Sequence, residues 1–209
     1  MNTIDKNQNK IRIFLIRHGQ PRQHSGKIFL GQADVPLSEP GREEASAAAD
    51  DLIRQNAGPK QIYTSDLARA RETAEIIAEK LGVPVVQDIL FREMAMGAWD
   101  GELIEDIKAK FPEEYAKRGD DPREYRTPGG ENFYDLRSRV LREFHRIFSE
   151  DFRDSAGDLV IVAHLGVLVS LSEELLSDPP DSYSGRKFPT GSVTVYDAPD
   201  WLRPEGIKT

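Results

Sequence analysis

Short apolar runs alternate with amphipathic segments along most of the chain, and this alternation constrains the fold more than any other feature. Strands are predicted over Ile11–Ile16, Gln61–Thr64, Val83–Gln87, Asp158–Ala163 and Ser192–Asp197. Helices are predicted from Ser38 to about Asn56, from Ser65 or Asp66 to Leu81, and over Leu103–Phe111, Glu113–Lys117, Phe133–Ser149 and Val167–Leu176. Strands that alternate with helices build a mostly parallel sheet covered on both faces. We therefore expect an α/β fold, a three-layer α/β/α sandwich.

The domain organisation expected from the sequence is simple. A chain of 209 residues suffices for one sizeable core, and no break resembles a linker, so residues 11–209 are predicted to form a single domain. The first ten residues are polar and lack the apolar core of a signal peptide, which predicts a disordered lead-in over residues 1–10. Residues 94–131 are polar and rich in glycine and proline, and we expect them to form a lid-like insertion over one end of the sheet.

Composition excludes several classes of function. The formal net charge of -8 argues against a nucleic acid or an anionic membrane as partner, and no apolar stretch is long enough to span a bilayer. The chain has no cysteine, which rules out disulfides and thiolate metal sites. The cytoplasm is the expected location, and a homodimer is the expected assembly if the chain associates.

Unusual residue types follow three of the predicted strands. Arg17, His18 and Gly19 follow the first strand, the second leads into a helix that carries Arg69, and His164 follows the fourth. Ligands of open α/β sheets bind outside the carboxyl ends of the strands, so these side chains are expected to converge. Two of only four histidines thus occupy equivalent positions, one of them beside an arginine.

Two arginines and two imidazoles favour chemistry on a phosphate. Arginine binds phosphate or carboxylate oxygens with two parallel hydrogen bonds, and a neutral imidazole can attack phosphorus. A metal site is the main competitor, but Arg17 would repel a divalent ion, and no His-x-x-x-His or His-Glu-x-x-His spacing occurs. The chain also lacks the Gly-x-Ser-x-Gly motif of serine hydrolases and the Gly-x-x-x-x-Gly-Lys phosphate loop. No metal and no cofactor are therefore expected.

Five segments in order resemble the histidine phosphatase superfamily, the phosphoglycerate mutase-like group. They are Leu15–Gly19 with Asp34–Ser38, Thr64–Ala74, Glu93–Gly101, Pro128–Glu131 and Val162–His164. The resemblance covers nearly everything from Ile11 to about Asp197. It implies that His18 is the nucleophile, that Arg17, Arg69 and His164 hold the phosphoryl group, and that Glu93 protonates the leaving oxygen and then helps to activate water. The implied activity is metal-independent hydrolysis of a small phosphorylated metabolite, α-ribazole phosphatase-like or of broad specificity.

The chain departs from the family pattern beside the phosphate. Gln20 and Pro21 replace the commoner Glu-Thr pair, and His24 stands where an asparagine that touches the phosphate is common. Gln20, His24 and Gly31 are therefore substrate-binding candidates. Two alternatives stay open: a cofactor-dependent phosphoglycerate mutase, and a module that binds phosphorylated ligands without catalysis.

Overall fold

The computed structural model describes residues 11–22, 25–152, 157–178 and 187–202. The lead-in expected over residues 1–10 and the substrate-binding candidate His24 lie outside the described residues.

The described strands form one mixed sheet in the order β3-β2-β4-β1-β5. β1, β2, β3 and β4 run parallel to one another, whereas the edge strand β5 pairs antiparallel with β1. Their bounds are β1 Arg12–Arg17, β2 Pro59–Thr64, β3 Val85–Gln87, β4 Asp158–Ala163 and β5 Val193–Asp197. The four parallel strands therefore bring their carboxyl ends to one edge of the sheet.

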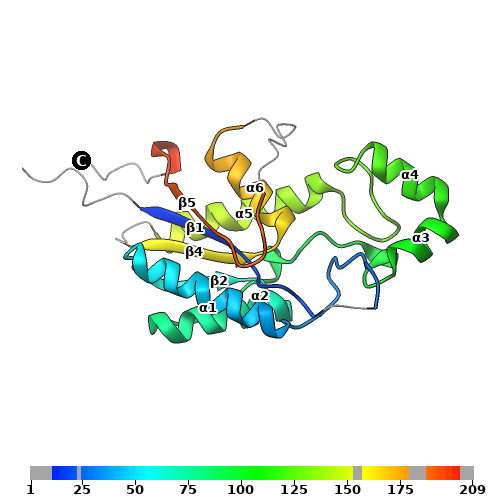
Figure 1. The fold of residues 1–209 in the computed structure, drawn as a ribbon. Coiled ribbons are helices and arrows are strands. Elements are labelled where there is room, and N and C mark those ends of the chain that lie inside the picture. Colours follow the sequence, from blue (N-terminus) through cyan, green and yellow to red (C-terminus); the bar gives the residue numbers. More distant parts are fainter. Residues whose placement is uncertain (1–10, 23–24, 153–156, 179–186, 203–209) are drawn as a thin grey trace, which may run out of the picture.

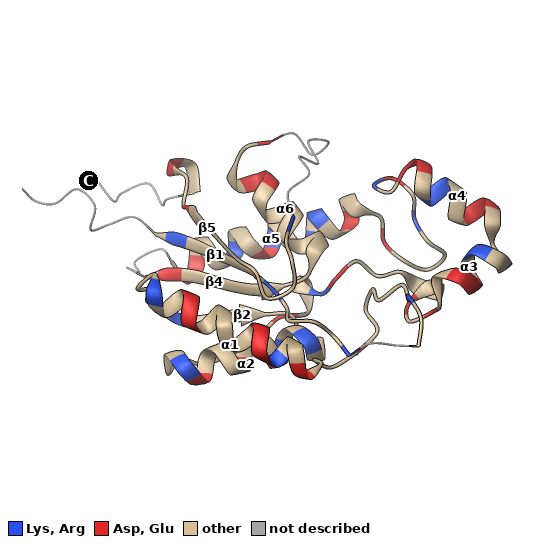
Figure 2. Ribbon diagram, viewed as in Figure 1, with Lys and Arg blue, Asp and Glu red and all other residues tan. Residues whose placement is uncertain are grey.

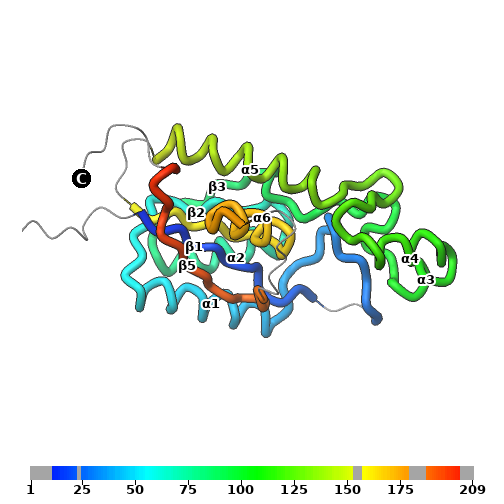
Figure 3. The backbone as a smooth tube through the Cα atoms, turned by 90° about the horizontal axis from the view of Figure 1, so that it is seen from above, coloured from blue at the N-terminus to red at the C-terminus, as the bar shows by residue number. Residues whose placement is uncertain are grey.

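Helices cover both faces of this sheet, as Figures 1 and 3 show. One layer holds α1 (Glu39–Arg54) and α2 (Ala68–Leu81), and the opposite layer holds α5 (Phe133–Glu150) and α6 (Leu165–Leu175). Two further helices, α3 (Ile104–Lys110) and α4 (Pro112–Asp120), lie beyond the carboxyl ends of the parallel strands. The expected three-layer sandwich with a lid-like insertion is confirmed.

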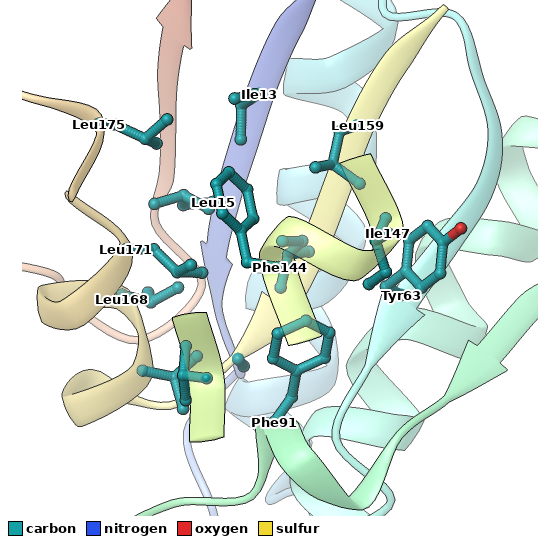
Figure 4. Packing of buried hydrophobic residues seen from close by; sticks show 14 of the residues in the cluster. Ile13, Leu15, Tyr63, Phe91, Phe144, Ile147, Leu159, Leu168, Leu171 and Leu175 are labelled. Carbon is teal, nitrogen blue, oxygen red and sulfur yellow. The ribbon is translucent and has the colours of Figure 1, made fainter. Parts of the chain in front are cut away.

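Side chains of β1 alternate between two hydrophobic cores. Ile13 and Leu15 belong to the core beneath α5 and α6, which Figure 4 shows from close by. Phe14 and Ile16 belong to the core beneath α1 and α2. All four are fully buried, because a central strand of a three-layer fold has no solvent-facing side.

Element boundaries differ from expectation where distant groups bind the helix ends. The second helix begins at Ala68, later than expected, because Ser65 Oγ accepts a hydrogen bond from the Leu67 amide at 3.2 Å and Asp34 accepts one from the Ala68 amide at 2.6 Å. The sixth begins at Leu165, earlier than expected, directly after His164. Helix α4 continues to Asp120 instead of ending near Lys117.

Charged residues lie mainly on the helices and the insertion, while the interiors of β1 and β4 carry none (Figure 2). Within the described ranges, no helix combines the length and the apolar composition that crossing a membrane requires.

Candidate active site

Strand register brings the two histidines together. Arg17 of β1 pairs with Ala163 of β4, so His18 and His164 each stand one residue beyond the end of neighbouring parallel strands. The His18 amide donates to the Ala163 carbonyl at 3.0 Å, which extends the ladder to the histidine itself. The centroids of the two imidazoles lie 5.1 Å apart.

A close backbone contact fixes the turn after His18. Gly19 packs against Gly41 near the start of α1, where a Cβ on either residue would collide with main-chain atoms of the other segment. The Gly19 amide donates to Thr73 Oγ1 at 3.0 Å, and that hydroxyl donates to the Arg69 carbonyl at 2.7 Å. The loop that carries His18 is therefore held against both α1 and α2.

The surroundings of His18 keep its imidazole neutral. Burial, followed by the positive charge of Arg69, lowers the pKa of His18 from 6.5 to about 3, and Arg17 adds to the effect. Nδ1 lies 2.8 Å from the Gly19 carbonyl, which can only accept, so Nδ1 carries the proton of the neutral ring. The lone pair is consequently on Nε2.

His164 is completely buried, and neither ring nitrogen has a hydrogen-bond partner among the described residues. Burial, followed by the charge of Arg69, lowers the pKa of His164 well below its usual value. Buried polar atoms without partners cost free energy, so their occurrence beside a candidate nucleophile indicates a site made for a polar ligand.

Two arginines supply positive charge to this site. Arg69 is fully buried and donates to two main-chain carbonyls, those of Gly31 at 2.7 Å and Ala33 at 2.8 Å, which leaves Nε without a protein partner. Burial lowers the pKa of Arg69 to about 10, offset in part by Glu93, and the group stays charged at neutral pH. Arg17 donates to the Phe188 carbonyl at 2.6 Å.

Glu93 reaches the site from the loop before the insertion. Its Oε1 accepts from the Met94 amide at 2.8 Å, and its Oε2 accepts from the Gly166 amide in the first turn of α6 at 3.3 Å. The approach is so close that a Cβ on Gly166 would meet the carboxylate. The carboxyl group therefore lies against the first turn of α6, the positive end of that helix, which begins directly after His164.

A cavity of about 830 Å³ adjoins Glu93 and Gly166 beneath the insertion. Its wall is largely apolar and includes Phe29, Met94 and Phe133, while Arg118 contributes a cation. The residues that line it include Leu165 and Gly166, which directly follow His164, but neither of the two imidazoles.

The structure brings together all five predicted catalytic residues: Arg17, His18, Arg69, Glu93 and His164. Gly31 lines the cavity and holds Arg69 through its carbonyl, at a φ of +41°. Gln20 Oε1 instead accepts from Ser38 Oγ at 3.1 Å.

Sequence reasoning missed one ion pair behind the site, between Arg139 and Glu131. Glu131 does not cap the following helix, because Asn132 and Asp135 form its capping box. A glutamate eight residues before an arginine on an otherwise ordinary helix provides no local signal for this pairing.

Comparison with known proteins places these observations among relatives. Residues 13–201 match the sequence profile of the histidine phosphatase superfamily, branch 1. The glucosyl-3-phosphoglycerate phosphatase of Mycolicibacterium vanbaalenii is 35% identical over 82% of this chain and 77% of its own. The 2,3-bisphosphoglycerate-dependent phosphoglycerate mutase of Arthrobacter sp. strain FB24 is 28% identical over 92% and 88%, respectively. The structure of the α-ribazole phosphatase from Shigella flexneri superposes with a TM-score of 0.79 at 26% identity, covering 88% of this chain and 89% of that one.

Proposed function

Because the chain belongs to branch 1 of the histidine phosphatase superfamily, we propose that it hydrolyses a small phosphomonoester through a phosphohistidine formed on Nε2 of His18. The observation that carries the proposal is the state of that imidazole: buried, neutral, and bonded through Nδ1 to a carbonyl. An imidazole so held presents a lone pair and no proton to phosphorus.

The proposed reaction has two steps. First, Nε2 of His18 forms a bond to phosphorus, the bond from phosphorus to the ester oxygen breaks, and Glu93 gives that oxygen a proton. Then water attacks phosphorus, Glu93 takes a proton from the water, and the phosphorus–nitrogen bond breaks with its electron pair returning to Nε2. Arg17, Arg69 and a neutral His164 hold the phosphoryl oxygens, since phosphoryl transfer depends mostly on positioning and charge stabilisation.

The test is hydrolysis of an aryl phosphate combined with trapping of labelled phosphate on the protein. Hydrolysis is expected to be equal with and without a chelator, to vanish in His18→Ala, and to persist in His145→Ala, a matched control on the outside of α5 with 47% of its side chain exposed. Label found on His18 would support the proposal and exclude the non-catalytic binding module. Undiminished hydrolysis by His18→Ala would refute it.

The cavity beside Glu93 supports an ester with a sizeable body. Its apolar and aromatic wall offers surface to a leaving group much larger than a methyl or ethyl group. Two of the relatives are named glucosyl-3-phosphoglycerate phosphatase and α-ribazole phosphatase. The substrates in these two names therefore belong in a screen of phosphorylated metabolites. The ester with the highest kcat/KM would identify the natural substrate class.

One observation favours the mutase as a second candidate. Arg118 lies over the ring of Phe29 at 5.6 Å and has no carboxylate partner among the described residues. Its natural partner one turn earlier, Glu114, instead accepts from Lys117 and Tyr125. A cation so placed would suit an acidic leaving group such as phosphoglycerate. Interconversion of phosphoglycerates in the presence of bisphosphoglycerate, faster than release of phosphate, would establish the mutase.

The cytoplasmic location and the homodimer stay predictions. Cell fractionation and analytical ultracentrifugation would test them separately.

A further inference from the structure

An ion pair behind the active site holds the backbone on both sides of Glu93. Arg139 of α5 and Glu131, just before that helix, are joined by two parallel hydrogen bonds: Nε to Oε1 at 2.7 Å and Nη2 to Oε2 at 2.8 Å. Only 14% of the arginine side chain and 20% of the glutamate side chain are exposed. The bonds to Arg139 hold the pKa of Glu131 below its usual value although burial would raise it.

Arg139 binds the chain before Glu93, and Glu131 binds the chain after it. Arg139 donates to three main-chain carbonyls within residues 90–93, those of Leu90 at 2.7 Å, Arg92 at 2.8 Å and Glu93 at 2.9 Å. The Glu131 carboxylate accepts from the Ala95 amide at 3.0 Å. Between β3 and α3, the loop that carries Glu93 has only two short 3-10 turns, Ile89–Phe91 and Gly97–Trp99. Glu93 lies in neither turn, so its main chain depends on bonds such as those to Arg139 and Glu131.

We infer that the Arg139–Glu131 pair positions Glu93 as the proton donor to the leaving oxygen. The inference rests on the proposed function. Arg139 and Glu131 are positioning residues, because their bonds to the loop are to main-chain atoms. Within the described part of the chain, the Glu93 carboxylate itself accepts hydrogen bonds from the Met94 and Gly166 amides and from no side chain. Without the pair, the loop would lose four hydrogen bonds and the carboxyl group its fixed place beside α6. A displacement of about 1 Å at a reacting group can cost about a hundredfold in rate.

The leaving group provides a readout that a purely structural role would not affect. An alkyl phosphate needs a proton on its leaving oxygen, whereas a nitrophenyl phosphate releases a stable anion and needs little help from an acid. The constant to compare is kcat/KM, because it reports only the steps up to release of the leaving group and not the later attack of water, in which Glu93 also takes part. In Arg139→Met we expect kcat/KM for an alkyl phosphate to fall about 10- to 100-fold and kcat/KM for nitrophenyl phosphate to change less than about threefold. Glu131→Gln retains one accepting oxygen, so the loss of kcat/KM should again be larger for the alkyl phosphate than for nitrophenyl phosphate, but by a smaller factor.

The chain offers a matched control on the same helix. Arg137 pairs with Glu174 at 2.9 Å, and 14% and 20% of the two side chains are exposed, as in the Arg139–Glu131 pair. Arg137→Met removes a half-buried ion pair from the same helix without removing a bond to the loop that carries Glu93. It should therefore lower kcat/KM equally for both esters, if at all. Glu93→Gln removes the proposed proton donor itself and shows what its complete loss does. In this variant kcat/KM should fall mainly for the alkyl phosphate.

Three outcomes are distinguishable. The inference is supported if kcat/KM falls more for the alkyl phosphate than for nitrophenyl phosphate in both Glu93→Gln and Arg139→Met; such losses are unequal. Unequal losses in Glu93→Gln with equal losses in Arg139→Met and Glu131→Gln overturn the inference and leave the proposed function standing. Equal losses in Glu93→Gln overturn the proposed role of Glu93, and the inference with it.

Discussion

Replacing His18 by asparagine should change how the stability of the protein depends on pH. The folded protein holds the pKa of His18 at about 3, while the unfolded chain has the ordinary value of 6.5. Since the folded pKa is the lower one, the unfolded state takes up a proton first, and stability falls as the pH drops from 6.5 towards 3. Between about pH 7 and about pH 5, this one group should lower the free energy of unfolding by about 2 kcal/mol.

Urea denaturation of wild type and His18→Asn at both pH values measures this effect. The difference in unfolding free energy between the two proteins should shift by about 2 kcal/mol in favour of the variant at the lower pH. Other titrating groups, including His164, contribute to both proteins and largely cancel. His145→Asn, at a half-exposed position on α5, serves as control.

The result that would refute the reasoning is a difference that stays constant within about 0.5 kcal/mol. His18 would then titrate alike in the folded and unfolded chain, and a neutral imidazole could not be assumed at the start of the reaction. The same experiment thus tests the electrostatic basis of the proposed nucleophile without measuring catalysis.

Four further outcomes follow from the site. Arg69→Lys keeps the charge but loses the fork, and kcat/KM should fall about a hundredfold or more; near wild-type rates would contradict the role of the guanidinium. Inorganic phosphate at about 100 times its Kd should stabilise the wild type by about 2.7 kcal/mol in thermal melts, and an equal gain in Arg69→Lys would count against phosphate binding there. Gly19→Ala should cost about 1–3 kcal/mol in urea denaturation because its methyl group collides with Gly41, and unchanged stability would show that the contact yields. Arg118→Ala should raise KM for a carboxylate-bearing ester but not for a neutral one, unlike the exposed control Lys117→Ala; parallel KM values would dismiss Arg118 as an anion contact.

The parts of the site that lie at strand ends could be predicted from the sequence. Continuous apolar runs identify the buried central strands, and parallel strands align their carboxyl ends, so His18 and His164 could be placed at the same edge of the sheet. The sequence did not predict that β1 and β4 are neighbours, which is what brings the two imidazoles into contact. The antiparallel direction of β5 was not predicted, because an alternating edge strand has the same pattern in either direction. Glu93 depended on the resemblance to a family, since a loop carboxylate among Asp100 and Glu102 has no pattern of its own.

The supporting contacts of the site could not be predicted. Arg69 is held by the carbonyls of Gly31 and Ala33, and main-chain carbonyls leave no trace in the sequence. The pairing of Arg139 with Glu131 likewise depends on how the loop folds back over α5. Local patterns identify residues on regular elements, whereas contacts between a loop and a helix depend on the assembled core.

The carbonyl partners of Arg17 and Arg69 have a consequence for the release of phosphate as well as for the binding of the ester. Both cations donate to main-chain carbonyls, which orient the guanidinium groups without changing their net charge. Free phosphate presents the same oxygens as the ester and carries no bulky group. If Arg17 and Arg69 bind the phosphoryl group as proposed, phosphate is expected to compete with the ester for the site, and its departure becomes a step of turnover to be measured.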